Sequence, residues 1–160
     1  MDTKLKEKNV QVPSNNIHNF LVAESLIDEL VKKAFGMRQY AYAPYSGFKV
    51  GAALLAKNGD IYGGCNIENA AYGPSNCAER TAFFKAVSEG VREFAAIAIV
   101  GGPESGVKDF CAPCGVCRQV MAEFCSPEEF YIILAKSIEE KKIYTLAQLF
   151  PEGFSPENLN

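Results

Sequence analysis

The chain has 160 residues, of which 48% are hydrophobic and 22% charged, and its net charge is −3. This is the size and composition of a single globular domain that can bury a core without disulfides. The negative net charge argues against a protein that binds nucleic acid by neutralising its phosphates. No apolar run is long enough to cross a bilayer. The first residues also lack the apolar core of a secretory signal, so we expect a cytoplasmic protein.

The first part of the chain predicts an arm and then a helix. Residues 1–16 are polar, so we expect a mobile N-terminal arm followed by a single domain over residues 17–160. From Ala23 to Met37, apolar residues recur at steps of three and four, which indicates an amphipathic helix. Pro44 should end this helix, because the residue before a proline avoids helical backbone angles.

A hairpin is predicted next. Phe48–Ala56 is rich in Val, Leu and small residues and predicts a strand, and Ile61–Ile67 predicts the returning strand. Between them, Asn58 and Gly59 form the strongest short signal for a tight hairpin turn. We therefore expect two antiparallel neighbours.

The remaining elements alternate between helices and strands. Ser75 or Asn76 is the expected cap of a helix over Ala78–Glu89, which Gly90 should close. The continuously apolar Phe94–Val100 predicts a strand buried on both faces. We then expect a loop at 101–113, a helix at 115–124, strands at 130–135 and 142–146, and a short helix at 146–150. This order predicts an α/β domain of three layers, with one mixed five-stranded sheet between helices.

The cysteines are the most informative residue type. There are six: Cys65, Cys77, Cys111, Cys114, Cys117 and Cys125. A chain of this length without an export signal does not need disulfides, and three cysteines within seven residues are too crowded for a bridge framework. We therefore expect reduced thiols that serve a metal or a chemical step.

Two short motifs place cysteines at predicted helix starts. They are Cys77-Ala-Glu79 and Pro113-Cys-Gly-Val-Cys117. Backbone N–H groups and the helix dipole stabilise thiolates at that end of a helix. The second motif lets two sulfurs face one point, and Cys77 would add a third. A catalytic zinc site keeps three protein ligands and an open position for water, whose protons Glu79 could handle.

Other interpretations of the cysteines stay open at this point. Cys114 and Cys117 could form a redox pair, although such pairs follow the first strand of a βαβ unit and this one comes late, after a long loop. Cys111 or Cys65 could close a structural site with a fourth sulfur, and Cys111 could pair with Cys114. On their own, Cys65 and Cys125 suit small buried apolar positions.

The single histidine, His18, lies beside the polar arm and is expected to be exposed. Because this only imidazole lies far from the other motifs, a Ser-His-Asp triad and a His-Glu-x-x-His protease site both lack their histidine here. The branch of zinc deaminases with a histidine ligand is excluded in the same way.

Five sequence blocks follow one another between about Ala23 and Leu159. They are Tyr42–Leu54 (YAPYSGFKVGAAL), Gly64–Ala70 (GCNIENA), Cys77–Ala82 (CAERTA), Pro113–Val120 (PCGVCRQV) and Leu149–Phe154 (LFPEGF). In this combination the chain resembles the cytidine deaminases, in their small homotetrameric form with three cysteine ligands. The resemblance implies one zinc ion per chain and hydrolytic deamination of cytidine and deoxycytidine, a step of pyrimidine salvage.

The resemblance also implies roles for individual residues. Cys77, Cys114 and Cys117 would bind the zinc, and Glu79 would be the catalytic proton shuttle. The implied substrate-binding residues are Phe48, Asn66, Glu68, Tyr72, Ala78 and Phe154.

Elementary geometry supports part of this set. Asn66 and Glu68 are two apart on a predicted strand, so they point to one face and can hold the two ribose hydroxyls. Phe48 would supply the aromatic wall that a planar pyrimidine needs. The resemblance alone implies that Phe154 reaches into the pocket of a neighbouring subunit, in a homotetramer with shared active sites.

Three thiolates around one Zn²⁺ leave a net negative charge, which is unfavourable for a Lewis acid. Arg80, directly after Glu79, is expected to offset this charge by donating hydrogen bonds to sulfur.

Two other functions compete with the nucleoside hydrolase. A blasticidin S deaminase would keep the fold and take a cytosine-bearing antibiotic. A non-catalytic zinc or RNA-binding module would need a basic and aromatic surface that this acidic chain does not indicate. We expect a small nucleoside and water as reactants, and neither a stable nucleic-acid partner nor a membrane.

Overall fold

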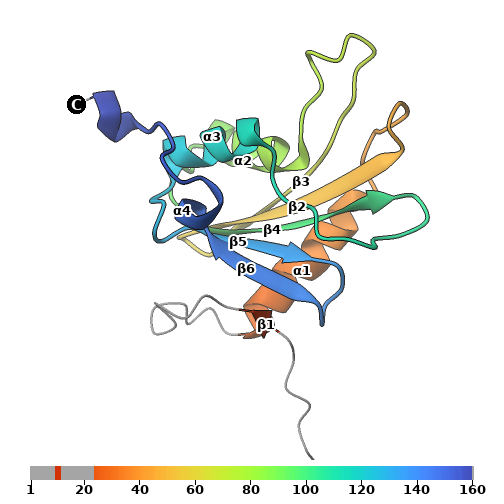
Figure 1. Ribbon diagram of the computed structural model, residues 1–160, viewed down its shortest axis with the longest axis horizontal. Coiled ribbons are helices and arrows are strands. Elements are labelled where there is room, and N and C mark those ends of the chain that lie inside the picture. Colours follow the sequence, from red (N-terminus) through yellow and green to blue (C-terminus); the bar gives the residue numbers. More distant parts are fainter. Residues whose placement is uncertain (1–9, 12–23, 160) are drawn as a thin grey trace, which may run out of the picture.

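The computed structural model describes residues 10–11 and 24–159 (Figure 1). Its elements in chain order are β1 Val10–Gln11, α1 Glu24–Arg38, β2 Phe48–Ala56, β3 Ile61–Cys65, α2 Ala78–Ser88, β4 Phe94–Pro103, α3 Gly115–Phe124, β5 Tyr131–Ala135, β6 Lys141–Thr145, α4 Leu146–Leu149 and the 3₁₀ helix η1 Pro156–Leu159. The predicted hairpin, helices and buried strands are all present, with ends that differ by a few residues.

The strands form one mixed sheet in the order β1-β6-β5-β4-β2-β3. The pairs β2–β3, β2–β4 and β5–β6 are antiparallel, whereas β4–β5 and β1–β6 are parallel. The five expected strands are β2 to β6. The two-residue β1 adds a sixth at the edge, within a segment for which the sequence predicted no structure; the rest of the expected arm and His18 lie outside the described residues.

Helices cover both faces of the sheet, which confirms the three-layer architecture (Figure 1). The alternation of side chains along a strand sends successive residues to opposite faces. On β2, Ala53 and Leu55 therefore pack under α1, whereas Ala52 and Leu54 pack under α2 and α3. The central β4 is buried on both faces, as its continuous apolar run predicts.

A close approach of backbones fixes the start of α2 above β3. A methyl group on Gly64 would lie only 2.3 Å from the Ala78 carbonyl oxygen and 2.5 Å from the Ala82 nitrogen. Only a residue without Cβ lets the helix lie this near the strand. The N-terminal end of α2, with its Cys-Ala-Glu motif, is thereby held over the end of the hairpin.

Three boundaries differ from the sequence prediction. The cap of α2 is Cys77 rather than Ser75 or Asn76, because Asn76 instead pairs its backbone with Ile67. β4 continues to Pro103 rather than ending at Val100, since Gly101 and Gly102 pair with β2. β3 ends at Cys65 rather than Ile67, for a reason that belongs to the site.

None of the helices in the described part of the chain is both long and apolar enough to cross a membrane.

Candidate metal centre and active site

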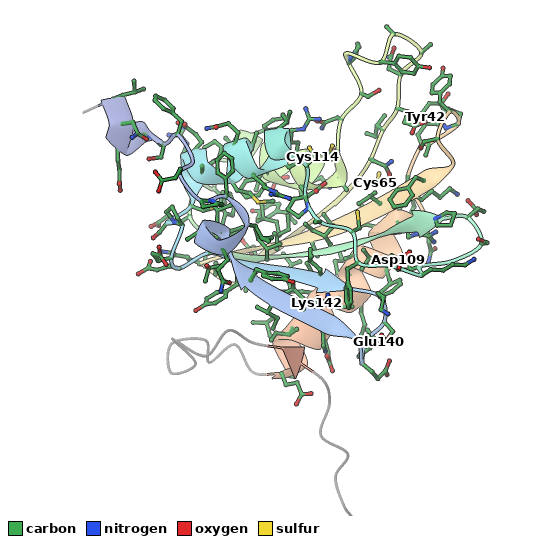
Figure 2. The ribbon with its side chains drawn as sticks, in the orientation of Figure 1. Tyr42, Cys65, Asp109, Cys114, Glu140 and Lys142 are labelled. Carbon is green, nitrogen blue, oxygen red and sulfur yellow. The ribbon has the colours of Figure 1, made fainter. Side chains whose placement is uncertain are left out.

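Three cysteine sulfurs meet where α2 and α3 begin. Cys77 is the N-cap residue of α2 and Cys114 that of α3, and neither side chain caps its own helix. Cys114 Sγ lies 3.8 Å from Cys77 Sγ and 3.5 Å from Cys117 Sγ, and all three sulfurs lie within 4.8 Å of one another. Figure 2 labels Cys114 at the start of α3 beside α2. The sulfurs thus gather at the positive ends of both helix dipoles.

This donor set fits a zinc ion. Zinc prefers thiolates among protein ligands, and three of them on two helix starts leave a fourth position to be filled. Among the described residues, the group of atoms close enough to share one ion contains neither Cys111 nor Cys65. The arrangement therefore favours an open site over a closed four-sulfur one.

Hydrogen bonds within the cluster make one thiol acidic. The bond from Cys117, with smaller contributions from Arg80 and Cys114, lowers the pKa of Cys77 to about 5 although burial acts against it. The pKa of Cys117 rises, because its thiol donates to Cys77 and is itself buried. The sulfurs are thus linked by shared protons, and a bound cation would take the place of those protons.

Arg80 extends from the first turn of α2 towards the same sulfurs. Its Nη2 donates to Cys77 Sγ at 3.5 Å. Its Nε is buried and has no hydrogen-bond partner among the described residues. Leaving a guanidinium N–H without a partner is costly. A half-buried cation kept beside the sulfurs at this cost indicates that the sulfurs carry negative charge.

Glu79 lies beside the sulfurs but outside their group. Its side chain is only 4% exposed, and this burial raises the pKa of Glu79 to about 7. A carboxyl group is almost never buried without a specific task or partner. This position suits a carboxyl group that exchanges protons beside the cluster rather than a metal ligand.

A cavity of about 320 Å³ opens over these groups. Its walls include Cys77, Ala78, Glu79, Asn66 and Glu68. The volume is at the lower end of the range for small-molecule sites, which suits one ring with a sugar. The cavity thus joins the sulfur cluster to the polar residues at the end of the hairpin.

Asn66 explains why β3 ends early. Its Oδ1 accepts from the Val50 N–H at 2.8 Å and its Nδ2 donates to the Phe48 carbonyl at 2.9 Å. The Asn66 N–H still donates to the Val50 carbonyl at 3.2 Å, but the side-chain oxygen takes the place of the Asn66 carbonyl as the acceptor in this pair. An amide has a second donor and further acceptor capacity, so Asn66 can still bind a ligand from a fixed orientation.

Glu68 is held by the loop before β2. Its Oε2 accepts from the backbone N–H groups of Tyr45 at 2.8 Å and Ser46 at 3.2 Å, and its Oε1 accepts from the Ser46 hydroxyl. The Ser46 hydrogen bond lowers the pKa of Glu68. The carboxylate is therefore charged and oriented before any ligand arrives.

The aromatic candidates lie at the rim or away from the cavity. Phe48 is 41% exposed at the start of β2. Tyr72 is 74% exposed with a φ of 57°, and its ring packs edge-on against that of Tyr45 with the centroids 6.2 Å apart. Both tyrosines line a second cavity of about 440 Å³, which shares Glu68 and Ser75 with the first. Phe154 is 56% exposed in the C-terminal tail, and its carbonyl accepts from Gln119. None of these three aromatic side chains is among the residues that line the cavity of their own chain.

Sequence reasoning gave no role in the cavity wall to several residues that line it. Cys111 lies there with Val50 and Ala112, and burial raises the pKa of its thiol to about 11. At neutral pH it is a neutral, apolar side chain. Its closeness to the Pro-Cys-x-x-Cys motif was the available signal, but that signal was interpreted only as a possible metal ligand.

Comparisons with known proteins agree with the geometry. Residues 24–133 match the family model described as the cytidine and deoxycytidylate deaminase zinc-binding region. The chain is 53% identical over 136 residues to a cytidine deaminase of Sporosarcina psychrophila, covering 84% of this chain and 95% of that protein. It is 49% identical over 131 residues to one of Halalkalibacterium halodurans, covering 82% and 96%.

A solved structure shows the same fold. The crystal structure of a cytidine deaminase from Burkholderia pseudomallei matches with a TM-score of 0.71 and 47% sequence identity. The match covers 79% of this chain and 97% of that one.

Proposed function

The chain belongs to the cytidine and deoxycytidylate deaminase family, and from that premise we propose how its residues carry out zinc-dependent hydrolysis of cytidine and deoxycytidine to the uracil nucleosides and ammonia. The observation that carries the proposal is the buried Glu79 carboxyl beside three converging sulfurs, at the base of a cavity for one nucleoside.

The metal ligands in this proposal are Cys77, Cys114 and Cys117, which would hold one zinc ion per chain. When bound, the ion supplies the Lewis acidity that makes water a nucleophile at neutral pH. The two helix starts bring the three sulfurs within 4.8 Å of one another, so the protein part of the site is arranged before the metal enters.

Glu79 moves the protons. Its carboxylate takes a proton from the attacking water and delivers it to N3 of the pyrimidine, which makes C4 electrophilic. Oxygen then bonds to C4. Glu79 takes the remaining proton from the new C4 hydroxyl and passes it to the 4-amino group as the C4–N bond breaks. Ammonia leaves and the ring keeps a carbonyl oxygen. The closed surroundings of Glu79 keep bulk water from competing for these protons.

Asn66 and Glu68 bind the sugar. Both are already oriented by backbone groups of the adjoining loop and strand, so little freedom is lost when ribose hydroxyls donate to the carboxylate and bond the amide. Ala78 contributes a small wall beside the metal ligands, and Phe48 packs against the base from the rim.

Arg80 offsets the negative charge of the thiolate cluster. Its hydrogen bond to Cys77, and its buried Nε without a partner in the described part of the chain, support this assignment. A charged donor next to sulfur reduces the negative charge that the thiolate places on the metal, so the metal remains an effective Lewis acid.

The Arg80→Gln variant should bind zinc about 10- to 100-fold more weakly, the usual cost of losing an outer partner of a metal ligand. Zinc competition with a chromophoric chelator measures this change. Arg92→Gln, at an exposed position after α2, is the matched control. Equal zinc affinity in both variants would rule out the proposed role.

The exposed aromatic residues support a shared active site between subunits. Phe154 and Tyr72 are more than half exposed and do not reach the cavity of their own chain, which suits residues that complete a neighbour's site. We place both at such contacts in a homotetramer, since closed symmetric assemblies are common among enzymes of this size.

Mixing two inactive variants tests this sharing. Phe154→Ala keeps Glu79, and Glu79→Ala keeps Phe154, so subunits exchanged between them should rebuild some complete sites. We expect the mixture to exceed the activity of either parent, with a native mass of four 17.5-kDa chains. Activity that never rises above the parents after verified subunit exchange would contradict the shared site.

The function itself is tested by substrate choice. The purified protein should contain about one zinc per chain and release ammonia from cytidine and deoxycytidine, with far weaker turnover of free cytosine, which lacks the sugar. Turnover of blasticidin S above that of cytidine would assign the site to the antibiotic, and zinc without turnover of either would indicate a binding module. The expected reaction suits nucleoside salvage in the cytoplasm by a single domain over residues 17–160.

A further inference from the structure

Behind Cys111, one of the wall residues of the substrate cavity, lies a contact that the reaction does not use. Gly101 of β4 lies beneath the side chains of Cys111 and Phe48. A methyl group on Gly101 would lie 2.7 Å from Cys111 Sγ, 2.8 Å from Cys111 Cβ and 3.0 Å from Phe48 Cε1. Carbon and sulfur atoms do not approach this closely, so the space above the glycine is already filled from both sides.

The Cys111 side of this contact is fixed. The preceding residue, Phe110, presents its ring to two ammonium groups, with Lys142 Nζ 4.6 Å and Lys136 Nζ 5.0 Å from the ring centroid. Figure 2 labels Lys142 on β6. On the other side, the buried Pro113 carbonyl accepts from Arg118 Nε at 2.8 Å. Cys111 is thus held between two anchored neighbours.

The Phe48 side can move. Its backbone is tied, since its N–H donates to Ser46 Oγ at 3.0 Å and its carbonyl accepts from Asn66. Its ring, however, belongs to a residue that is 41% exposed at the rim of the site. Any change in the volume above Gly101 will therefore be absorbed by the ring of Phe48 rather than by Cys111.

We propose that Cys111, seated on Gly101, is a positioning residue that sets where the Phe48 ring stands beside the nucleoside cavity and so determines how tightly substrate binds. The inference rests on the proposed function, because it assigns Phe48 to the pyrimidine. It gives Cys111 a role as a sized wall rather than as a ligand or a reactive thiol. A neutral thiol of that volume suffices, so serine should replace it.

The test compares kinetic constants for cytidine across four variants of the zinc-loaded enzyme. Cys111→Ala removes the support and Gly101→Ala pushes the ring outward. Both should raise KM about tenfold, the lower range for a methylene-sized change in an apolar pocket, while kcat stays within about threefold. Cys111→Ser should keep KM near that of the wild type.

Cys125→Ala is the matched control, because it deletes a buried sulfur from the same core without touching the cavity. It should lower the melting temperature and leave KM unchanged. The inference is overturned if Cys111→Ala behaves like Cys125→Ala, or if its zinc content and kcat fall together while KM does not change. Should Gly101→Ala fail to fold, the pair of Cys111 variants decides alone.

The wild-type enzyme in the same assay separates the two proposals. An active wild type with unchanged KM in the Cys111→Ala variant overturns only the positioning role. A wild type that releases no ammonia from cytidine overturns the proposed function, and the positioning role with it.

Discussion

The Glu79→Gln variant should keep its zinc and its fold and lose about 10³-fold in kcat for cytidine. A positioned proton-transfer group contributes 10² to 10⁴ to a rate, and Glu79 is expected to move two protons in one cycle. Glutamine has the same shape but cannot carry a proton between water, N3 and the leaving amine. Because Glu79 is only 4% exposed, a neutral isostere should also be tolerated in its buried position.

The matched control is Glu89→Gln, which alters an exposed carboxylate at the other end of α2. It should leave kcat, KM and zinc content unchanged. Stopped-flow or continuous absorbance assays of cytidine, with zinc measured on the same samples, give the comparison. If Glu79→Gln retained kcat within about tenfold of the wild type, another group would have to move the protons.

Cys117→Ala should weaken zinc binding by more than about 100-fold, because the loss of a ligand costs more than the loss of an outer partner. The enzyme should then be isolated with little zinc and no measurable turnover. Its melting temperature should also stop responding to added zinc, whereas that of the wild type should rise, since a ligand that binds only the folded state stabilises it.

Cys125→Ala again serves as the control for deleting a buried sulfur. It should lose stability by the ordinary cost of a small cavity and keep one zinc per chain. Zinc retained at full occupancy by Cys117→Ala would show that the three sulfurs do not act as one ligand set.

The sequence predicted the elements and the sulfur cluster because both depend on local patterns. The spacing of hydrophobic residues predicts strands and helices to within a few residues. The residues next to Cys77 and Cys114 indicate that helices begin there. Their meeting point followed from the resemblance and from the tendency of thiolates to gather at helix N-termini.

What the sequence missed depends on contacts between distant segments. That Asn66 would end β3 by bonding the backbone of β2 requires the strand register. The packing of Cys111 on Gly101 depends on the extension of β4 past Val100. Sequence propensity did not predict this extension, because Gly101 and Gly102 are poor strand formers. The substrate-binding role of Tyr72 and the reach of Phe154 into a neighbouring subunit's pocket are not tested by a single chain, and both stay predictions.

X-ray absorption at the zinc edge of the resting enzyme tests the central claim most directly. The account predicts three sulfur neighbours at about 2.3 Å and one lighter oxygen neighbour at about 2.0 Å, as expected for an open catalytic site. Four sulfur neighbours would contradict it, because no position would then be left for the water that Glu79 must deprotonate.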